Sequence, residues 1–101
     1  MQVKNVTLKQ QLMEEIADLK QQCKTLHIAS VSEGQEALSS YAPFAEQADG
    51  SLFLLLSHLA RHSANLQYHW QHSVPVSVQI IEDEHQCRNL FARKRLNYTS
   101  I

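Results

Sequence analysis

The chain has few of the residues that interrupt regular structure, since its 101 residues contain only two glycines and two prolines. Two cysteines, Cys23 and Cys87, stand far apart without a CxxC pair, which excludes a disulfide framework and predicts free thiols. Charge of one sign is also lacking. Nine Lys and Arg face ten Asp and Glu for a formal net charge of −1, so neither nucleic acid nor an acidic membrane is a general target.

Long apolar stretches are absent as well. The longest run, residues 52–56, is far too short to span a bilayer. The first ten residues lack the apolar stretch of a signal peptide, so we expect a cytoplasmic protein. Hydrophobic residues at 44% and charged residues at 19% are globular values, and the length predicts one domain over residues 1–101.

Apolar residues recur at helical spacing near the start: Leu8, Leu12, Ile16, Leu19 and Cys23. This stripe predicts a helix over residues 7–22, with Thr7 and Gln10 as a capping box.

Five strands are expected after this helix. The first covers residues 25–31 and is followed by a turn at 32–34, and the second covers 37–45, where Pro43 indicates an edge or a bulge. The third covers 51–56, is entered through the Asp49-Gly50 hairpin and should be buried on both faces. The last two cover residues 75–81 and 93–99. A helix over residues 57–68 should bury Leu59, Leu66 and Trp70, and a short helical stretch should lie near Asn89. This order predicts a mainly β, antiparallel barrel or sheet.

The densest group of chemical side chains lies on that second helix. His58, Arg61, His62, Asn65 and His69 share one face, and the helix start near Ser57 suits a phosphate or carboxylate. A solvated helix face that carries several histidines is an equally good interpretation.

Other chemistry has weaker support in the sequence. A metal site is disfavoured because the HExxH pattern is absent, and Ser57 is not in a GxSxG elbow. The acids at 82–84 fit a solvated turn. The cations at 93–95 fit either an anionic cofactor or a protected edge strand.

Four segments together resemble the haem-iron-utilisation branch of the pyridoxamine-phosphate-oxidase-like, FMN-binding split-barrel superfamily. They are SSYAPF (39–44), LLSHLARHSANL (55–66), VSVQIIED (76–83) and LFARKRL (90–96). The resemblance implies a six-stranded antiparallel split barrel that forms a homodimer with cofactor sites at the interface. It covers about residues 8–98.

The resemblance also implies which residues meet the cofactor. Flavin-binding members have Arg and Lys at the positions of Ser40 and Ala45, and Ser-Arg-Lys at the positions of 60–62. Only Arg61 remains as a strong phosphate ligand, with His62 as a weaker substitute, so FMN binding should be weakened. This pattern is similar to the branch that binds haem and degrades it oxidatively.

The expected cofactor site therefore comprises Ser40, Tyr41, Ser57, Arg61, His62 and Asn65, with haem or FMN as the cofactor. The branch carries its axial histidine in the C-terminal part, and this chain ends at Ile101, so the resemblance implies no proximal ligand here. A flavin-dependent oxidoreductase and a non-catalytic binding domain are the alternative functions.

Overall fold

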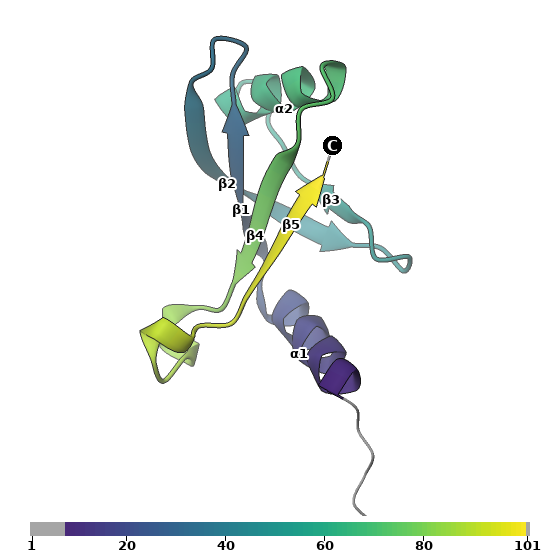
Figure 1. The fold of residues 1–101 in the computed structure, drawn as a ribbon, viewed down its shortest axis with the longest axis vertical. Helices are drawn as coiled ribbons and strands as arrows, with labels where there is room; N and C mark the ends of the chain where they lie inside the picture. Colours follow the sequence, from purple (N-terminus) through teal and green to yellow (C-terminus); the bar gives the residue numbers. More distant parts are fainter. Residues whose placement is uncertain (1–7, 101) are drawn as a thin grey trace, which may run out of the picture.

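The computed structural model describes residues 8–100 as an antiparallel sheet with two helices (Figure 1). The elements, in chain order, are α1 (Leu8–Gln22), β1 (Thr25–Val31), β2 (Ala37–Glu46), β3 (Leu52–Leu54), α2 (Arg61–Gln71), β4 (Val76–Ile81), the 3₁₀ turns η1 (Glu84–Gln86) and η2 (Leu90–Ala92), and β5 (Arg95–Ser100). The mainly β, antiparallel class is as predicted. None of the described helices has the length and apolar character needed to cross a membrane.

The sheet has the strand order β3-β2-β1-β4-β5, with every neighbouring pair antiparallel. The described residues thus supply five strands of the six that the resemblance implies. β1 is the central strand and alternates strictly, with Leu26, Ile28 and Ser30 buried and the residues between them exposed. This period of two places one face of the sheet against the core.

The core is small and joins both helices to the sheet. Its buried apolar members are Leu19, Leu26, Ile28, Ala42, Leu66, Val76 and Ile80. Full burial of a leucine or isoleucine contributes about 1.5–3 kcal/mol, so Leu26, Ile28 and Ile80, the largest fully buried side chains, hold the sheet centre together.

Helix α1 has the predicted extent, but its apolar stripe meets the sheet only at its C-terminal end. Leu19 is buried, whereas Leu8 and Leu12 are exposed. The predicted capping residue Thr7 lies outside the described residues. An ion pair between Lys20 and Glu46 ties α1 to the end of β2. The hydrogen bond that Lys20 Nζ donates to the Glu46 carboxylate raises the pKa of Lys20, and burial opposes this effect only in part.

At Pro43, strand β2 changes its pairing partner from β1 to β3. The predicted edge or bulge at this residue is wrong, because β2 is an inner strand. The ladder with β1 ends where Pro43 faces Thr25, and the ladder with β3 begins at Phe44. Proline lacks a backbone N–H, so the junction between two ladders is a position that tolerates it. Its carbonyl is still used, since it accepts a hydrogen bond from Leu55 N at 3.0 Å.

The predicted hairpin at Asp49-Gly50 joins β2 to β3. Gly50 has a φ of 90°, and Gln47 and Ser51 close the turn through a 2.8 Å backbone hydrogen bond. Hydrogen bonds from the Ser51 hydroxyl and backbone hold the pKa of Asp49 below its usual value. The prediction that 51–56 is buried on both faces is wrong. Phe53 and Leu55 are exposed, whereas Leu52, Leu54 and Leu56 are half-buried, which is the pattern of a strand covered on one face.

Helix α2 begins four residues later than predicted. The Ser57 hydroxyl accepts a hydrogen bond from Leu59 N at 3.2 Å, and Ala60 N donates to the Ser57 carbonyl. These bonds fold 57–60 into a turn, which is the alternative that serine offers the backbone. Of the predicted buried residues, only Leu66 is buried; Leu59 is 95% exposed and Trp70 is 63% exposed.

The last strand also starts later than predicted, at Arg95 rather than Arg93. Arg93 precedes the strand and donates through its guanidinium to the Glu82 carbonyl, which fixes the chain before β5 begins.

Candidate functional site

Part of the polar face of α2 packs against the sheet rather than facing water. Asn65 is 7% exposed and donates from Nδ2 to the Ser30 hydroxyl at 3.1 Å. His69, at 2% exposed, lies one turn further along the helix. The interpretation of a fully solvated face is therefore wrong for these two residues. Buried polar groups need partners, and β1 provides them.

His69 is held by two backbone groups. Its Nε2 accepts a hydrogen bond from Val31 N at 3.0 Å, and its Nδ1 lies 3.0 Å from the Val74 carbonyl oxygen. Nε2 must be unprotonated to accept the first bond, and Nδ1 must carry a proton to donate the second. The ring is therefore the neutral Nδ1–H tautomer, with both nitrogens occupied.

His62 and Arg61 stand at the start of α2. His62 is half-buried, and its Nδ1 lies 3.0 Å from the Ser40 hydroxyl on β2. Arg61 is exposed and forms only a long ion pair with Glu36, at 3.5 Å. A surface pair of this kind contributes little stability, so the Arg61 guanidinium is available to a ligand.

The first turn of α2 has a further property that favours anions. Its N-cap, Ala60, supplies no side-chain hydrogen bond. The first backbone N–H groups of a helix have no partner within the helix, and the helix dipole places partial positive charge there. Arg61 and His62 therefore lie where backbone and side-chain charge both favour an anionic group.

The structure brings together four of the six predicted site residues. Arg61, His62 and Asn65 lie on one helix, and Ser40 contacts His62 from the sheet. Ser57 lies in the turn just before the helix. Tyr41 follows Ser40 along β2, so its side chain projects to the opposite face of the sheet, where it is exposed.

An apolar cavity of about 530 Å³ is lined in part by Leu66, the buried leucine of α2. It opens between the two edge strands and α2, and none of the described residues that line it is charged. The lining consists of Leu26, Gly50, Ser51, Leu52, Phe53, Leu54, Leu56, Leu66, Trp70, Val76, Val78 and Tyr98.

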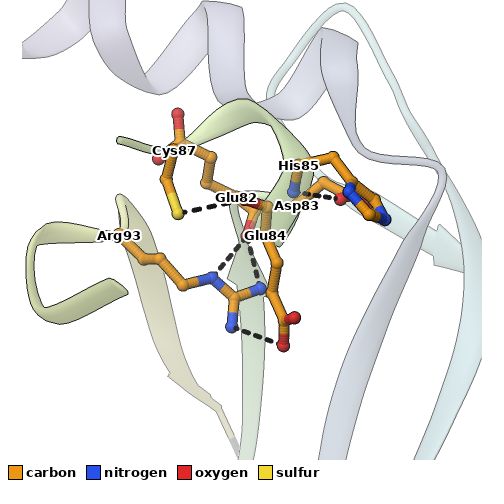
Figure 2. A network of polar contacts seen from close by, with 6 residues as sticks. All are labelled: Glu82, Asp83, Glu84, His85, Cys87 and Arg93. Carbon is orange, nitrogen blue, oxygen red and sulfur yellow. Dashed lines mark hydrogen bonds and ion pairs between the residues drawn. The ribbon is translucent and has the colours of Figure 1, made fainter. Parts of the chain in front are cut away.

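The acidic segment after β4 is a structural loop (Figure 2). Asp83 accepts a hydrogen bond from His85 N at 2.8 Å, and the thiol of Cys87 donates to the Glu84 carbonyl at 3.4 Å. The Arg93 guanidinium binds the Glu82 carbonyl and lies 3.9 Å from the Glu84 carboxylate. The acids thus order the turn, as the solvated-turn interpretation predicts.

Within residues 8–100, no group of three or more His, Cys, Asp or Glu side chains is placed so that it could hold a metal ion. Cys23 and Cys87 are both free and half-buried. Burial raises the pKa of the Cys23 thiol, with a further contribution from Asp83 and Glu82, and the thiol donates to the Ile81 carbonyl at 3.3 Å.

Two residues in this region were not predicted from the sequence. Ser30 and Glu36, the partners of Asn65 and Arg61, come from β1 and the loop before β2. The sequence does not reveal these partners, because the pairing depends on how α2 is placed on the sheet. The cavity also carries no local signal, since its lining comes from five separate elements and from the loops on either side of β3.

Comparison with known proteins finds relatives that act on haem. The chain is 42% identical over 100 residues to the haem oxygenase HutZ of Vibrio cholerae, a match that covers 99% of this chain and 54% of the relative. It also resembles a crystal structure of HutZ, described as a haem storage protein from Vibrio cholerae, with a TM-score of 0.72 and 42% identity. That superposition covers 87% of this chain and 58% of the other.

A crystal structure of ChuZ from Campylobacter jejuni matches with a TM-score of 0.76 at 23% identity, over 87% of this chain and 34% of the other, and this likeness concerns the fold. No protein-family model matches the chain. The chain spans about half the length of the curated relative it matches.

Proposed function

We propose that this chain, which resembles the haem-utilisation split-barrel family, binds haem and takes part in the oxidative use of haem iron. The observation that carries the proposal is the 42% identity to a haem oxygenase, which extends over 99% of this chain. The matched region includes the whole helix α2 and the strands that support it.

The residues at the start of α2 fit the anionic edge of haem. Arg61 offers a guanidinium that is held only by a 3.5 Å pair with Glu36, and a propionate can displace that pair. Leu59, two residues before it, is 95% exposed, so an apolar group stands beside the cation. A haem molecule combines an apolar ring with carboxylates, and this pairing of side chains matches both.

The chain's own residues have separate tasks in this proposal. Arg61 binds the propionate, with His62 next to it. The Ser40 hydroxyl positions the His62 ring, and the Asn65–Ser30 and His69–Val31 hydrogen bonds fix α2 on the sheet. When haem is bound, its iron and oxygen supply the redox chemistry.

FMN is the competing cofactor. A flavin phosphate is dianionic and in flavin-binding members meets several cations, whereas Ser40 and Ala45 are uncharged here and His62 stands in place of a lysine. The Ser40 hydroxyl is also engaged by His62. Haem fits this reduced set of cations better than FMN, because each propionate carries a single negative charge.

We also propose that the protein works as a cytoplasmic homodimer. Exposed apolar side chains on several elements, among them Phe53, Leu55 and Leu59, support a covering partner, and β3 and β5 are sheet edges without a further described strand.

The absorbance spectrum tests the cofactor directly. We expect the purified chain to develop a Soret band with a 1:1 end point when haem is added, and no flavin bands after addition of FMN followed by gel filtration. Retained FMN together with an unchanged haem spectrum would favour the flavoprotein alternative. Retention of neither would leave a non-catalytic binding domain as the function.

A further inference from the structure

We propose that the loop between β4 and β5 docks the protein on an anionic lipid bilayer. The docking residues are the apolar pair Leu90 and Phe91 in the 3₁₀ turn η2 and the cations Arg88, Lys94 and Arg95 on either side of it. We call these five residues the basic tip. The proposed haem site uses none of them, so this inference does not rest on haem binding.

The apolar pair of the basic tip is open to solvent. Phe91 is 97% exposed and Leu90 is 62% exposed. Their loop lies at the opposite end of the sheet from α2 and protrudes beyond the ends of β4 and β5 (Figure 1). Adjacent aromatic and aliphatic side chains gain free energy by leaving water. At a protruding loop they can enter the interfacial layer of a bilayer while the rest of the fold stays in place.

Hydrogen bonds give the loop a fixed shape. The Asn89 side chain accepts a hydrogen bond from Phe91 N at 3.0 Å, and the Asn89 carbonyl accepts one from Ala92 N at 2.9 Å. The Arg93 guanidinium donates to the Glu82 carbonyl and so holds the returning chain (Figure 2). Because the turn is already ordered, docking would cost little conformational entropy.

The acids of the loop are engaged within the loop itself. Asp83 accepts a hydrogen bond from the backbone N–H two residues further on, and Glu82 accepts one from the backbone N–H of Lys94 at 3.3 Å. Glu84 lies 3.9 Å from the Arg93 guanidinium, which offsets its charge. All three acids precede or form η1, so the residues next to η2 in the chain carry no negative charge.

The cations of the basic tip, in contrast, are free. Within residues 8–100, the side chains of Arg88, Lys94 and Arg95 are exposed and form no hydrogen bond or ion pair. The net charge of −1 gives the chain as a whole no attraction to acidic lipid, but a local group of unpaired cations attracts anionic headgroups at short range. A bilayer satisfies both parts of the tip, because its phosphates lie above an apolar layer. A free anion would leave Phe91 in water.

Co-sedimentation of the full chain with lipid vesicles tests the proposal. One set of vesicles contains phosphatidylcholine alone, and the other contains phosphatidylcholine mixed with phosphatidylglycerol. We expect the chain to bind the anionic vesicles about ten-fold or more tightly than the neutral ones. Added salt should weaken this binding, because it screens the attraction between the cations and the headgroups.

Variants of the apolar pair locate the contact. Phe91→Asp should lower the affinity for anionic vesicles about ten-fold or more, because it replaces the apolar group with a charge that the headgroups repel. Phe91→Trp should retain the binding, since tryptophan also favours the membrane interface. Leu8→Asp is the matched control, because Leu8 is 71% exposed but belongs to α1, and it should bind like the unmodified chain.

Variants of the cations test the charge separately. The double change Lys94→Gln and Arg95→Gln should weaken binding to anionic vesicles and reduce its dependence on salt. The control removes two exposed cations elsewhere, by Lys9→Gln and Lys24→Gln, and should leave the affinity and its salt dependence unchanged. Circular dichroism checks that each variant is folded.

Three results would overturn the proposal. The first is a folded chain that binds neither kind of vesicle, or binds both equally. The second is equal binding by Phe91→Asp and Leu8→Asp. The third is a Phe91→Asp variant that no longer dimerises when lipid is absent, since a second copy would then be what covers the tip.

Discussion

At the scale of single residues, His69 is the side chain on which the placement of α2 depends most. It is buried, both ring nitrogens bind backbone groups, and one of these groups, Val31 N–H, belongs to the central strand. His69→Ala leaves that N–H without a partner and opens a cavity, so we expect a loss of about 2–4 kcal/mol in the free energy of unfolding. Urea unfolding followed by circular dichroism measures it.

His72→Ala is the control, because His72 lies one residue beyond α2 and its side chain is exposed. Its change should stay within about 0.5 kcal/mol. Equal losses in the free energy of unfolding for the two variants would contradict the role of His69 in placing α2 on the sheet.

Cys23 is a half-buried residue whose ionisation should affect stability at alkaline pH. Burial raises the thiol pKa in the folded chain above its ordinary value of 9.0. The folded state therefore binds this proton more tightly than the unfolded state, so stability is intact below pH 9.0 and falls as the pH rises through the raised pKa. The melting temperature should decline above this pH, and less so in Cys23→Ala.

The same thiol should react slowly. Iodoacetamide at neutral pH should modify Cys23 in the folded chain much more slowly than in the unfolded chain, because the thiolate is the nucleophile.

Thiol counting in denaturant without reductant should find two free thiols per chain. A count of zero would contradict the free state of Cys23 and Cys87.

At the scale of elements, the β2–β3 hairpin depends on one glycine. Gly50 has a φ of 90°, a conformation that side chains with a Cβ rarely adopt. We therefore expect Gly50→Ala to lower the free energy of unfolding by about 1 kcal/mol. No atom lies within 4 Å of the added Cβ, so the loss would come from the backbone alone.

Gly34→Ala is the matched control. Its Cβ would meet only the Ser32 hydroxyl, at an ordinary contact distance of 3.7 Å. Stability should stay level or rise by up to about 1 kcal/mol, since alanine restricts the unfolded chain. A loss equal to that of Gly50→Ala would refute the backbone explanation.

Elements with a clear local signal were predictable from the sequence. The strand at 25–31 and the helix ending at Gln22 have their predicted bounds, because apolar periodicity sets both. The start of α2 was not predictable in this way, since the Ser57 hydroxyl captures the Leu59 N–H and delays the helix to Arg61. Such local competition leaves no mark in the periodicity of the sequence.

The candidate site was predictable only in part, for a related reason. Hydrophobicity predicts that Leu59 and Trp70 are buried, and one of the two interpretations of the helix leaves Asn65 and His69 in solvent; the structure instead exposes the first pair and buries the second. The reversal depends on partners from β1, whose Ser30 hydroxyl and Val31 N–H satisfy the buried polar groups. The tertiary placement of a helix decides this, and propensity cannot.

At the scale of the whole molecule, the exposed apolar surface indicates assembly. The two sheet edges, the cavity with Trp70, and the outer part of α1 with Leu8 and Met13 all remain uncovered. We expect sedimentation at micromolar concentration to give about twice the chain mass of 11.6 kDa. A single species at 11.6 kDa would contradict the homodimer.

We propose that the start of α2 holds the anionic edge of haem. Haem titration of Arg61→Ala, compared with Arg88→Ala, tests it most directly, because Arg88 is an exposed arginine in the loop between η1 and η2. Loss of a charge-assisted hydrogen bond costs about 1.5–3 kcal/mol, so we expect the Kd for haem to be roughly ten- to a hundred-fold higher in Arg61→Ala. Arg88→Ala should bind like the unmodified chain, and equal affinities for the two variants would contradict a haem-binding role of Arg61.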